Sequence, residues 1–197
     1  IVNVEGDEWE ESIDRSDKLE TVESHPELTP EEIISRVKNA GVTGMGGAGF
    51  PTFIKLTPPP TAKAECVIIN GVECEPYITS DYRLMLEHTD EIIQGLYLLM
   101  KAVKVEKGYI GIEDNKPKAI EIFEQKTAGD PRIEIVPLKK KYPQGGEKQL
   151  VDAVINRQVP APPAIPVNVG AILQHDRPAA AAEQAVITNN PDTEHHT

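Results

Sequence analysis

The sequence predicts an α/β fold: a Rossmann-like three-layer domain with a mostly parallel sheet, preceded by a glycine-rich loop. Three short apolar runs lie between residues 64 and 138, and each is followed by a segment with helical spacing of apolar residues. Strands that alternate with helices favour a parallel sheet with right-handed crossovers. Glycines gather just before the first run, at residues 44–49.

The first expected element is a short helix. Residues 1–28 are acidic and lack periodic apolar positions, which is typical of the tail of a preceding domain or of a solvated arm. At Thr29 the pattern changes, because Thr29, Pro30 and Glu32 offer an N-cap, a proline at the first helical position and a capping-box glutamate. Gly41 is expected to end this helix.

The glycine-rich stretch, GMGGAG at residues 44–49, matches G-x-G-x-x-G by letters. It fails as a Rossmann fingerprint, because a helix precedes it and Pro51 follows it. Its glycines still permit a backbone that closely approaches a flat or phosphorylated ligand, with Lys55 as a counter-charge. A flexible loop is the alternative interpretation.

The alternation that defines the fold begins after a proline-rich loop. The run AECVIIN at 64–70 has the continuous apolar character of a buried strand. A helical pattern follows at about 81–102, with a break at His88-Thr89. The expected later elements are strands at 107–114 and 132–138 and helices at 117–126 and 146–156. We expect the domain to span 29–175, and 176–197 to be a C-terminal extension that starts a truncated following module.

Composition excludes several classes of protein. The chain of 197 residues has 20 basic and 32 acidic residues and a net charge of −12, so nucleic acid is not an expected partner. The sequence has no apolar run of membrane-spanning length and no signal peptide, and we expect a soluble chain. Only Cys66 and Cys74 are present, too few for an iron–sulfur cluster.

Ligands of open parallel sheets bind beyond the carboxyl ends of the strands. The loops there read NGVECEPYITSDYR, EDNKP and KKKYPQGGEK. Gly145 and Gly146 precede a helix, and their N–H groups can face an anion, although a simple helix-entry turn explains them as well. Phe50 and Tyr142 are candidates for stacking on a ring, or they close local apolar clusters.

The acidic residues in the first of these loops could be metal ligands or an acid–base pair, or they could simply be solvated. Glu73 and Glu75 lack the histidines of a usual zinc site, and surface carboxylates are more often solvated than catalytic. We therefore expect no metal site. Cys74 has no histidine partner placed by the sequence, which favours a structural or ligand-lining thiol over a reactive one.

Three separated stretches together resemble the C subunit of the Rnf electron transport complex. They are GMGGAGFPTFIKL, INGVECEPYITSDYRLM and KYPQGGEKQL, with GIEDNKP between the last two, and the resemblance covers roughly residues 29–173. The same stretches are similar, more distantly, to the NADH-binding flavoprotein subunit of respiratory complex I. Met45, Val72 and Gly146 stand where those more distant relatives often carry Arg, Asp and Glu.

The resemblance implies a cofactor and the residues that hold it. The cofactors would be FMN and NAD(H), with Phe50 stacking on the adenine of NADH, Glu75 near the nicotinamide, and no side chain acting as a catalytic acid or base. The residues implied to bind FMN are Gly44, Gly46, Lys55, Asn70, Glu73, Cys74, Tyr142, Gly145, Gly146 and Glu147.

The implied function is hydride transfer between NADH and FMN in an ion-translocating ferredoxin:NAD oxidoreductase. The implied partners are NADH or NAD, the membrane and iron–sulfur subunits of an Rnf-type complex and, indirectly, ferredoxin. The family places such a subunit peripherally on the cytoplasmic side of the cell membrane, with iron–sulfur clusters in a C-terminal part beyond this sequence.

Two alternatives stay open. One is a cobalamin reductase or a hydrogenase-linked diaphorase that shares the module. The other is a flavin-less scaffold that only docks partner subunits. The scaffold alternative rests on the stretch QHDRPAAA after Leu173, where the family resembles QNVGTA.

Overall fold

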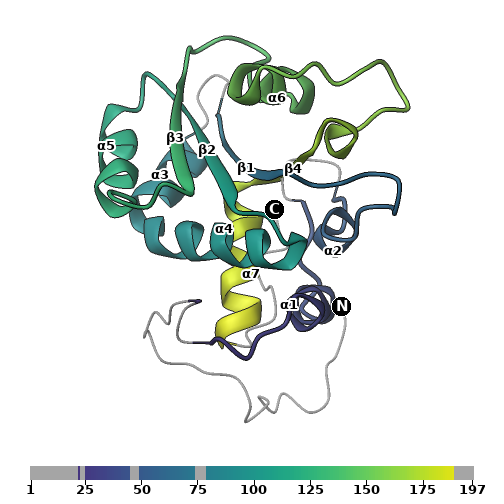
Figure 1. The fold of residues 1–197 in the computed structure, drawn as a ribbon. Coiled ribbons are helices and arrows are strands. Elements are labelled where there is room, and N and C mark those ends of the chain that lie inside the picture. The colour runs from purple at the N-terminus through teal and green to yellow at the C-terminus, as the bar shows by residue number, and fades with distance from the viewer. Residues whose placement is uncertain (1–21, 23–24, 45–48, 74–78, 189–197) are drawn as a thin grey trace, which may run out of the picture.

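The computed structural model describes Val22 and residues 25–44, 49–73 and 79–188. Figure 1 shows a central parallel sheet with helices on both sides. In chain order the elements are α1 (Pro30–Asn39), α2 (Thr52–Lys55), β1 (Cys66–Gly71), α3 (Ser80–Glu87), α4 (Thr89–Val103), β2 (Lys107–Glu113), α5 (Pro117–Lys126), β3 (Ile133–Leu138), α6 (Glu147–Ile155), η2 (Pro166–Val169), β4 (Ala171–His175), α7 (Asp176–Glu183) and η3 (Gln184–Thr188).

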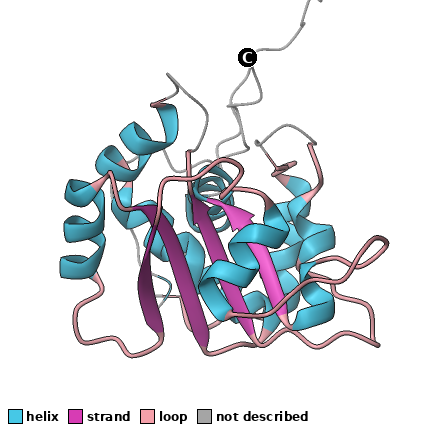
Figure 2. Ribbon diagram, turned by 90° about the horizontal axis from the view of Figure 1, so that it is seen from above, coloured by secondary structure: helices cyan, strands magenta, loops and turns pink. Residues whose placement is uncertain are grey.

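The sheet has four strands in the order β3-β2-β1-β4, and every neighbouring pair is parallel. Side chains of β1 alternate between its two faces. Val67 and Ile69 belong to the core beneath α4 and α7, whereas Cys66 and Ile68 belong to the core beneath α6. The expected three-layer, mostly parallel α/β fold is therefore confirmed, and Figure 2 shows the same layers from above.

Local sequence signals position the first helices as expected. The Thr29 hydroxyl accepts a hydrogen bond from the Glu32 N–H, and the Glu32 carboxylate accepts one from the Thr29 N–H, which completes the capping box of α1. Gly41 follows the helix with a positive φ of 75°. The predicted break at His88-Thr89 is also present, because His88 separates α3 from α4.

The C-terminal part of the structure, from residue 171 onward, differs from the expectation. Residues 171–175 form a fourth strand that pairs with β1, and no strand was expected there. The alanine-rich run that follows forms α7, and its residues are buried, mainly against α4. The folded unit thus continues to Thr188, past position 175, at which the sequence analysis placed the end of the domain.

Small residues in both helices allow α7 to pack closely against α4. A Cβ atom built on Gly95 of α4 would lie 2.0 Å from the carbonyl oxygen of Ala179 in α7, so the two backbones are in direct contact. Alanines along α7 keep its own side chains short. Among the described helices, none is both long and apolar enough to cross a bilayer.

Candidate ligand site at the carboxyl ends of the strands

The order of the strands marks the place where a ligand binds. The chain adds β2 and β3 on one side of β1 and then returns to add β4 on the other side. In open α/β sheets, such a switch point leaves a crevice beyond the carboxyl ends of the two strands. Asn70 of β1 and His175 of β4 are register partners at this point, so their flanking loops define the candidate site.

Asn70 joins the loop after β3 to the end of β1. Its side chain is fully buried, its Nδ2 donates to the Gly145 carbonyl at 3.0 Å, and its Oδ1 accepts from the Val72 N–H at 3.1 Å. These bonds bring Asn70 and Gly145 together, as their assignment to one pocket requires.

Lys55 of α2 reaches two elements that are distant in sequence. Its Nζ donates to the Leu173 carbonyl of β4 and to Glu147 Oε1 at the start of α6, both at 3.1 Å. The Lys55 side chain is 22% exposed, so part of it is accessible to a ligand. The structure therefore places Lys55 and Glu147 in contact at the switch point.

The start of α6 has no side-chain cap. Gly146 is its N-cap and provides no side chain to bond the first N–H groups of the helix. Both glycines lie in tight places, because a Cβ on Gly145 would lie 3.3 Å from the Val72 carbonyl oxygen and one on Gly146 would lie 3.1 Å from that of Pro143. The helix dipole and the uncapped N–H groups favour an anion at this end.

Glu73 is nearly buried and is held at both oxygens. Its Oε1 accepts from the Asp81 N–H at 2.9 Å, and its Oε2 accepts from Lys116 Nζ at 2.6 Å. Lys116 also lies 3.7 Å from Glu113 Oε2, so two buried carboxyl groups share one ammonium. Sequence reasoning singled out Glu73 but not Lys116 or Glu113, although both belong to the loop noted after the second strand.

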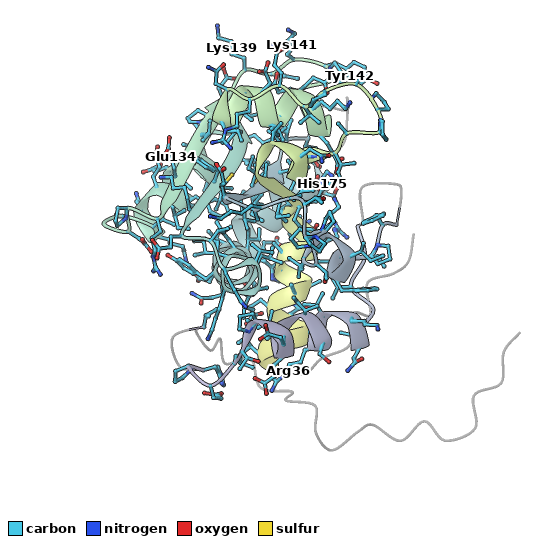
Figure 3. All side chains as sticks on the ribbon, turned by 45° about the vertical axis from the view of Figure 1, so that its right-hand side comes forward. Arg36, Glu134, Lys139, Lys141, Tyr142 and His175 are labelled. Carbon is cyan, nitrogen blue, oxygen red and sulfur yellow. The ribbon has the colours of Figure 1, made fainter. Side chains whose placement is uncertain are left out.

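The remaining expected residues are less closely grouped. Gly44 donates to the Phe50 carbonyl at 2.8 Å, which closes the glycine-rich loop, and Phe50 itself is 45% exposed. Tyr142 is 75% exposed and lies at the periphery beside Lys139 and Lys141 (Figure 3). Gly46, Cys74 and Glu75 lie outside the described residues. The assignments of all these residues to FMN or NADH stay predictions.

The unexpected strand β4 adds polar groups of its own. Gln174 is buried, its Nε2 donates to Thr52 Oγ1 at 2.9 Å, and its Oε1 has no hydrogen-bond partner in the described part of the chain. Burial lowers the pKa of the next residue, His175. Burial, reinforced by the charge of Asp81, raises the pKa of the Asp176 carboxyl. The apolar run at 171–173 was the available signal for this strand.

Taken together, these groups define a class of protein. A cation, a helix start without a side-chain cap and a buried amide oxygen lie at the switch point of a parallel sheet, which is the arrangement of a nucleotide-binding α/β module. No cluster of three or more metal-ligating side chains occurs among the residues described.

Comparison with known proteins identifies the family. Residues 37–193 match the family model described as the Nuo51 FMN-binding domain, and the chain belongs to this family. Over 180 residues it is 44% identical to the C subunit of the proton-translocating ferredoxin:NAD(+) oxidoreductase complex of Clostridium ljungdahlii, covering 91% of this chain and 38% of that protein. Over 195 residues it is 42% identical to the C subunit of the Na(+)-translocating complex of Acetobacterium woodii, covering 94% and 43%.

The expected resemblance to the Rnf-type C subunits is thus confirmed, and the chain spans about two fifths of the length of these relatives. A crystal structure of NAD+-reducing [NiFe]-hydrogenase in the H2-reduced state is 24% identical, with a TM-score of 0.63, covering 80% of this chain and 31% of that one. At this identity the likeness supports the fold alone.

Proposed function

We propose that this chain binds FMN and NADH at the switch point and serves as the flavin module of an ion-translocating ferredoxin:NAD oxidoreductase. The observation that carries the proposal is the contact of Lys55 with both β4 and α6 inside a member of the Nuo51 FMN-binding family. The relatives at 44% and 42% identity are named as subunits of such complexes.

The residues at the site fit FMN. Lys55 and the uncapped start of α6 together suit a phosphate, since an ammonium and backbone N–H groups both bind oxyanions. Gly145 and Gly146 keep the loop beside them free of side chains, and the Gln174 Oε1 atom can accept a hydrogen bond from a heterocyclic N–H. Glu147 neutralises Lys55 in the structure, so phosphate would compete with this carboxylate for the ammonium.

The protein binds and orients, and the bound groups carry out the redox chemistry. FMN supplies the capacity to accept a hydride from the nicotinamide and to release electrons one at a time. The chain's own residues fix the loops, with Asn70 tying the loop after β3 to β1 and Lys55 tying α2 to β4. Asn70, Glu73 and Gln174 are buried polar side chains at or just beyond the carboxyl ends of β1 and β4. No side chain is assigned as a catalytic acid or base.

The wider assembly is proposed from the relatives. Ferredoxin, ion-translocating membrane subunits and iron–sulfur clusters would act outside the module, with this chain peripheral at the cytoplasmic face of the membrane. Cys66 is buried, and its pKa is raised to about 11 by burial, so this thiol is suited to neither metal ligation nor redox exchange. With only two cysteines in the sequence, electron transfer onward would use clusters in other parts of the complex.

Replacing Lys55 with alanine tests the proposed site directly. A charge-assisted hydrogen bond typically contributes about 1.5–3 kcal/mol, so FMN affinity is expected to fall about tenfold or more. Fluorescence titration of the apoprotein with FMN measures this. Lys63→Ala is the matched control, because Lys63 is exposed and lies at the amino end of β1, away from the site. Equal affinity for both variants, with both folded, would remove the phosphate role of Lys55.

A second test concerns the reaction. With FMN bound, the isolated chain is expected to reduce ferricyanide with NADH, because this requires only the flavin and the nucleotide. Ferredoxin-linked reduction of NAD is expected to be absent, because the sequence contains only two cysteines. Rapid ferredoxin-linked turnover by this chain alone would contradict the proposed division of labour. A flavin-saturated protein inactive with ferricyanide would favour the scaffold alternative.

A further inference from the structure

Lys116 and Glu113 have no role in the function proposed so far. Lys116 lies between β2 and α5, and its Nζ is 2.6 Å from Glu73 Oε2 and 3.7 Å from Glu113 Oε2. The three side chains are 10%, 3% and 1% exposed, so the whole cluster is removed from water. A buried ion cluster of this kind is weak evidence for stability, because the cost of desolvation offsets the attraction. This makes a role at the site worth considering.

The cluster has more carboxyl groups than ammonium groups. Two carboxyl groups face one ammonium, and neither oxygen of Glu113 has a hydrogen-bond partner among the described residues. The other charged groups that influence Glu113 are Lys140, from the loop after β3, and Glu73 itself. Burial raises the pKa of Glu113, with Lys116 opposing the shift, so Glu113 is the member that tolerates a proton. Glu73 is the closer partner of Lys116, with 2.6 Å between Lys116 Nζ and Glu73 Oε2.

Glu73 performs a positioning task that depends on its orientation. Its second oxygen accepts the Asp81 N–H in the first turn of α3, 8 residues further along the chain. One carboxylate therefore joins the segment directly after β1 to the start of the next helix. Lys116 fixes this carboxylate from the neighbouring loop and also lies 5.5 Å from the ring centroid of Tyr82 in α3. The backbone of Lys116 is itself held by its N–H bond to the Glu113 carbonyl.

We propose that Lys116 is a positioning residue of the ligand site, which acts by holding the Glu73 carboxylate between β1 and α3. The inference deepens the proposed function and rests on it for the ligand. It explains why a lysine is buried at this position: without the ammonium, two carboxyl groups would face each other in a dry environment, and Glu73 would turn away from Asp81. Lys116 itself makes no contact with FMN in this proposal.

The first experiment needs no cofactor. In the apoprotein, hydrogen exchange of the Asp81 amide, followed by NMR, reports on its bond to Glu73. Lys116→Met keeps most of the length of the side chain and removes its charge, and it is expected to accelerate this exchange about tenfold while the core of β1 stays protected. Lys118→Met is the matched control, since Lys118 is exposed two positions further on, in the first turn of α5. Unchanged exchange at Asp81 in a folded Lys116→Met protein would overturn the proposal.

The second experiment measures FMN binding in a double-mutant cycle. Lys116→Met and Glu73→Gln are each expected to weaken FMN affinity about tenfold, and the double variant no more than either one, because both remove the same contact. Additive losses would show that Lys116 does not act through Glu73 and would overturn the proposal. If Lys116→Met does not fold, the comparison of Glu73→Gln with the double variant, in which Glu73 is already neutral, still tests the coupling.

The two experiments separate this inference from the proposed function. If the parent protein binds no FMN at all, the proposed function fails, whereas the exchange of the Asp81 amide still decides whether Lys116 positions Glu73. If the parent binds FMN and Lys116→Met binds it equally well, the function stands and the positioning role is lost.

Discussion

Replacing Gly95 with alanine is expected to destabilise the fold, although alanine is the better helix former. In the interior of a helix, alanine is favoured over glycine by about 1 kcal/mol. Here the new Cβ would lie 2.0 Å from the carbonyl oxygen of Ala179, which is backbone and cannot rotate away. The helices α4 and α7 must separate, and a net loss of about 2 kcal/mol or more in unfolding free energy is expected from overpacking.

Urea unfolding followed by circular dichroism measures this loss, and its sign discriminates between the two effects. A gain in stability would mean that helix propensity dominates and that α7 does not contact α4 as closely as the structure shows. The change also extends to the ligand site, because α7 begins directly after His175. Gly95→Ala is thus expected to weaken FMN binding even though Gly95 lies in α4, away from the loops at the carboxyl ends of the strands.

The second large effect concerns pH. Glu183 in α7 is 2% exposed, and its pKa is raised to about 7 by burial, with the charge of Glu91 adding to the shift. A folded-state pKa above the ordinary value of 4.5 means that the folded protein holds this proton more tightly than the unfolded chain. The stability gained in this way is complete below pH 4.5 and is lost as the pH rises through 7.

Glu183→Gln is therefore expected to remove the loss of folding stability that the parent shows as the pH rises. The difference in unfolding free energy, variant minus parent, should be about 2 kcal/mol larger at pH 8 than at pH 5, so the variant is relatively more stable at the higher pH. One unit of pKa shift corresponds to about 1.4 kcal/mol. Urea unfolding at several pH values measures the difference. Glu124→Gln makes the same chemical change at an exposed position of α5 and serves as the control. Parallel profiles for the Glu183 variant and the parent would contradict the assignment.

Local signals in the sequence were sufficient for the elements from α1 to α6. The capping box at Thr29, the break at His88 and the three apolar runs each depend on residues within a few positions of one another. Such signals act through short-range hydrogen bonds and side-chain periodicity, which a single sequence reveals directly. Once the alternation of strands and helices was established, the general rule for parallel sheets pointed to the loops of the candidate site, whose binding role stays a prediction.

The segment of β4 and α7 was not predicted by the same reasoning because its signals are weak. A run of alanines has little amphipathic contrast, and the strand before it has only five residues. The burial of α7 depends on Gly95, which lies in another helix more than eighty positions earlier. The expected boundary at 175 followed from interpreting this alanine-rich run as an extension. In the structure, the small side chains allow α7 to pack closely against α4.

For the candidate site, the sequence by itself determined which loops and which ligand-type residues are available: Lys55, Asn70, Glu73 and the Gly145-Gly146 pair. Only the tertiary structure decided how they are used. Lys55 meets the Leu173 carbonyl across 118 positions, and Glu73 meets Lys116 across 43. The physical reason is that these contacts are created by the order of the strands in the sheet. The strand β4 pairs with β1 because this pairing buries the apolar faces of both strands. Such a long-range pairing produces no periodic pattern in the sequence around the residues that come into contact.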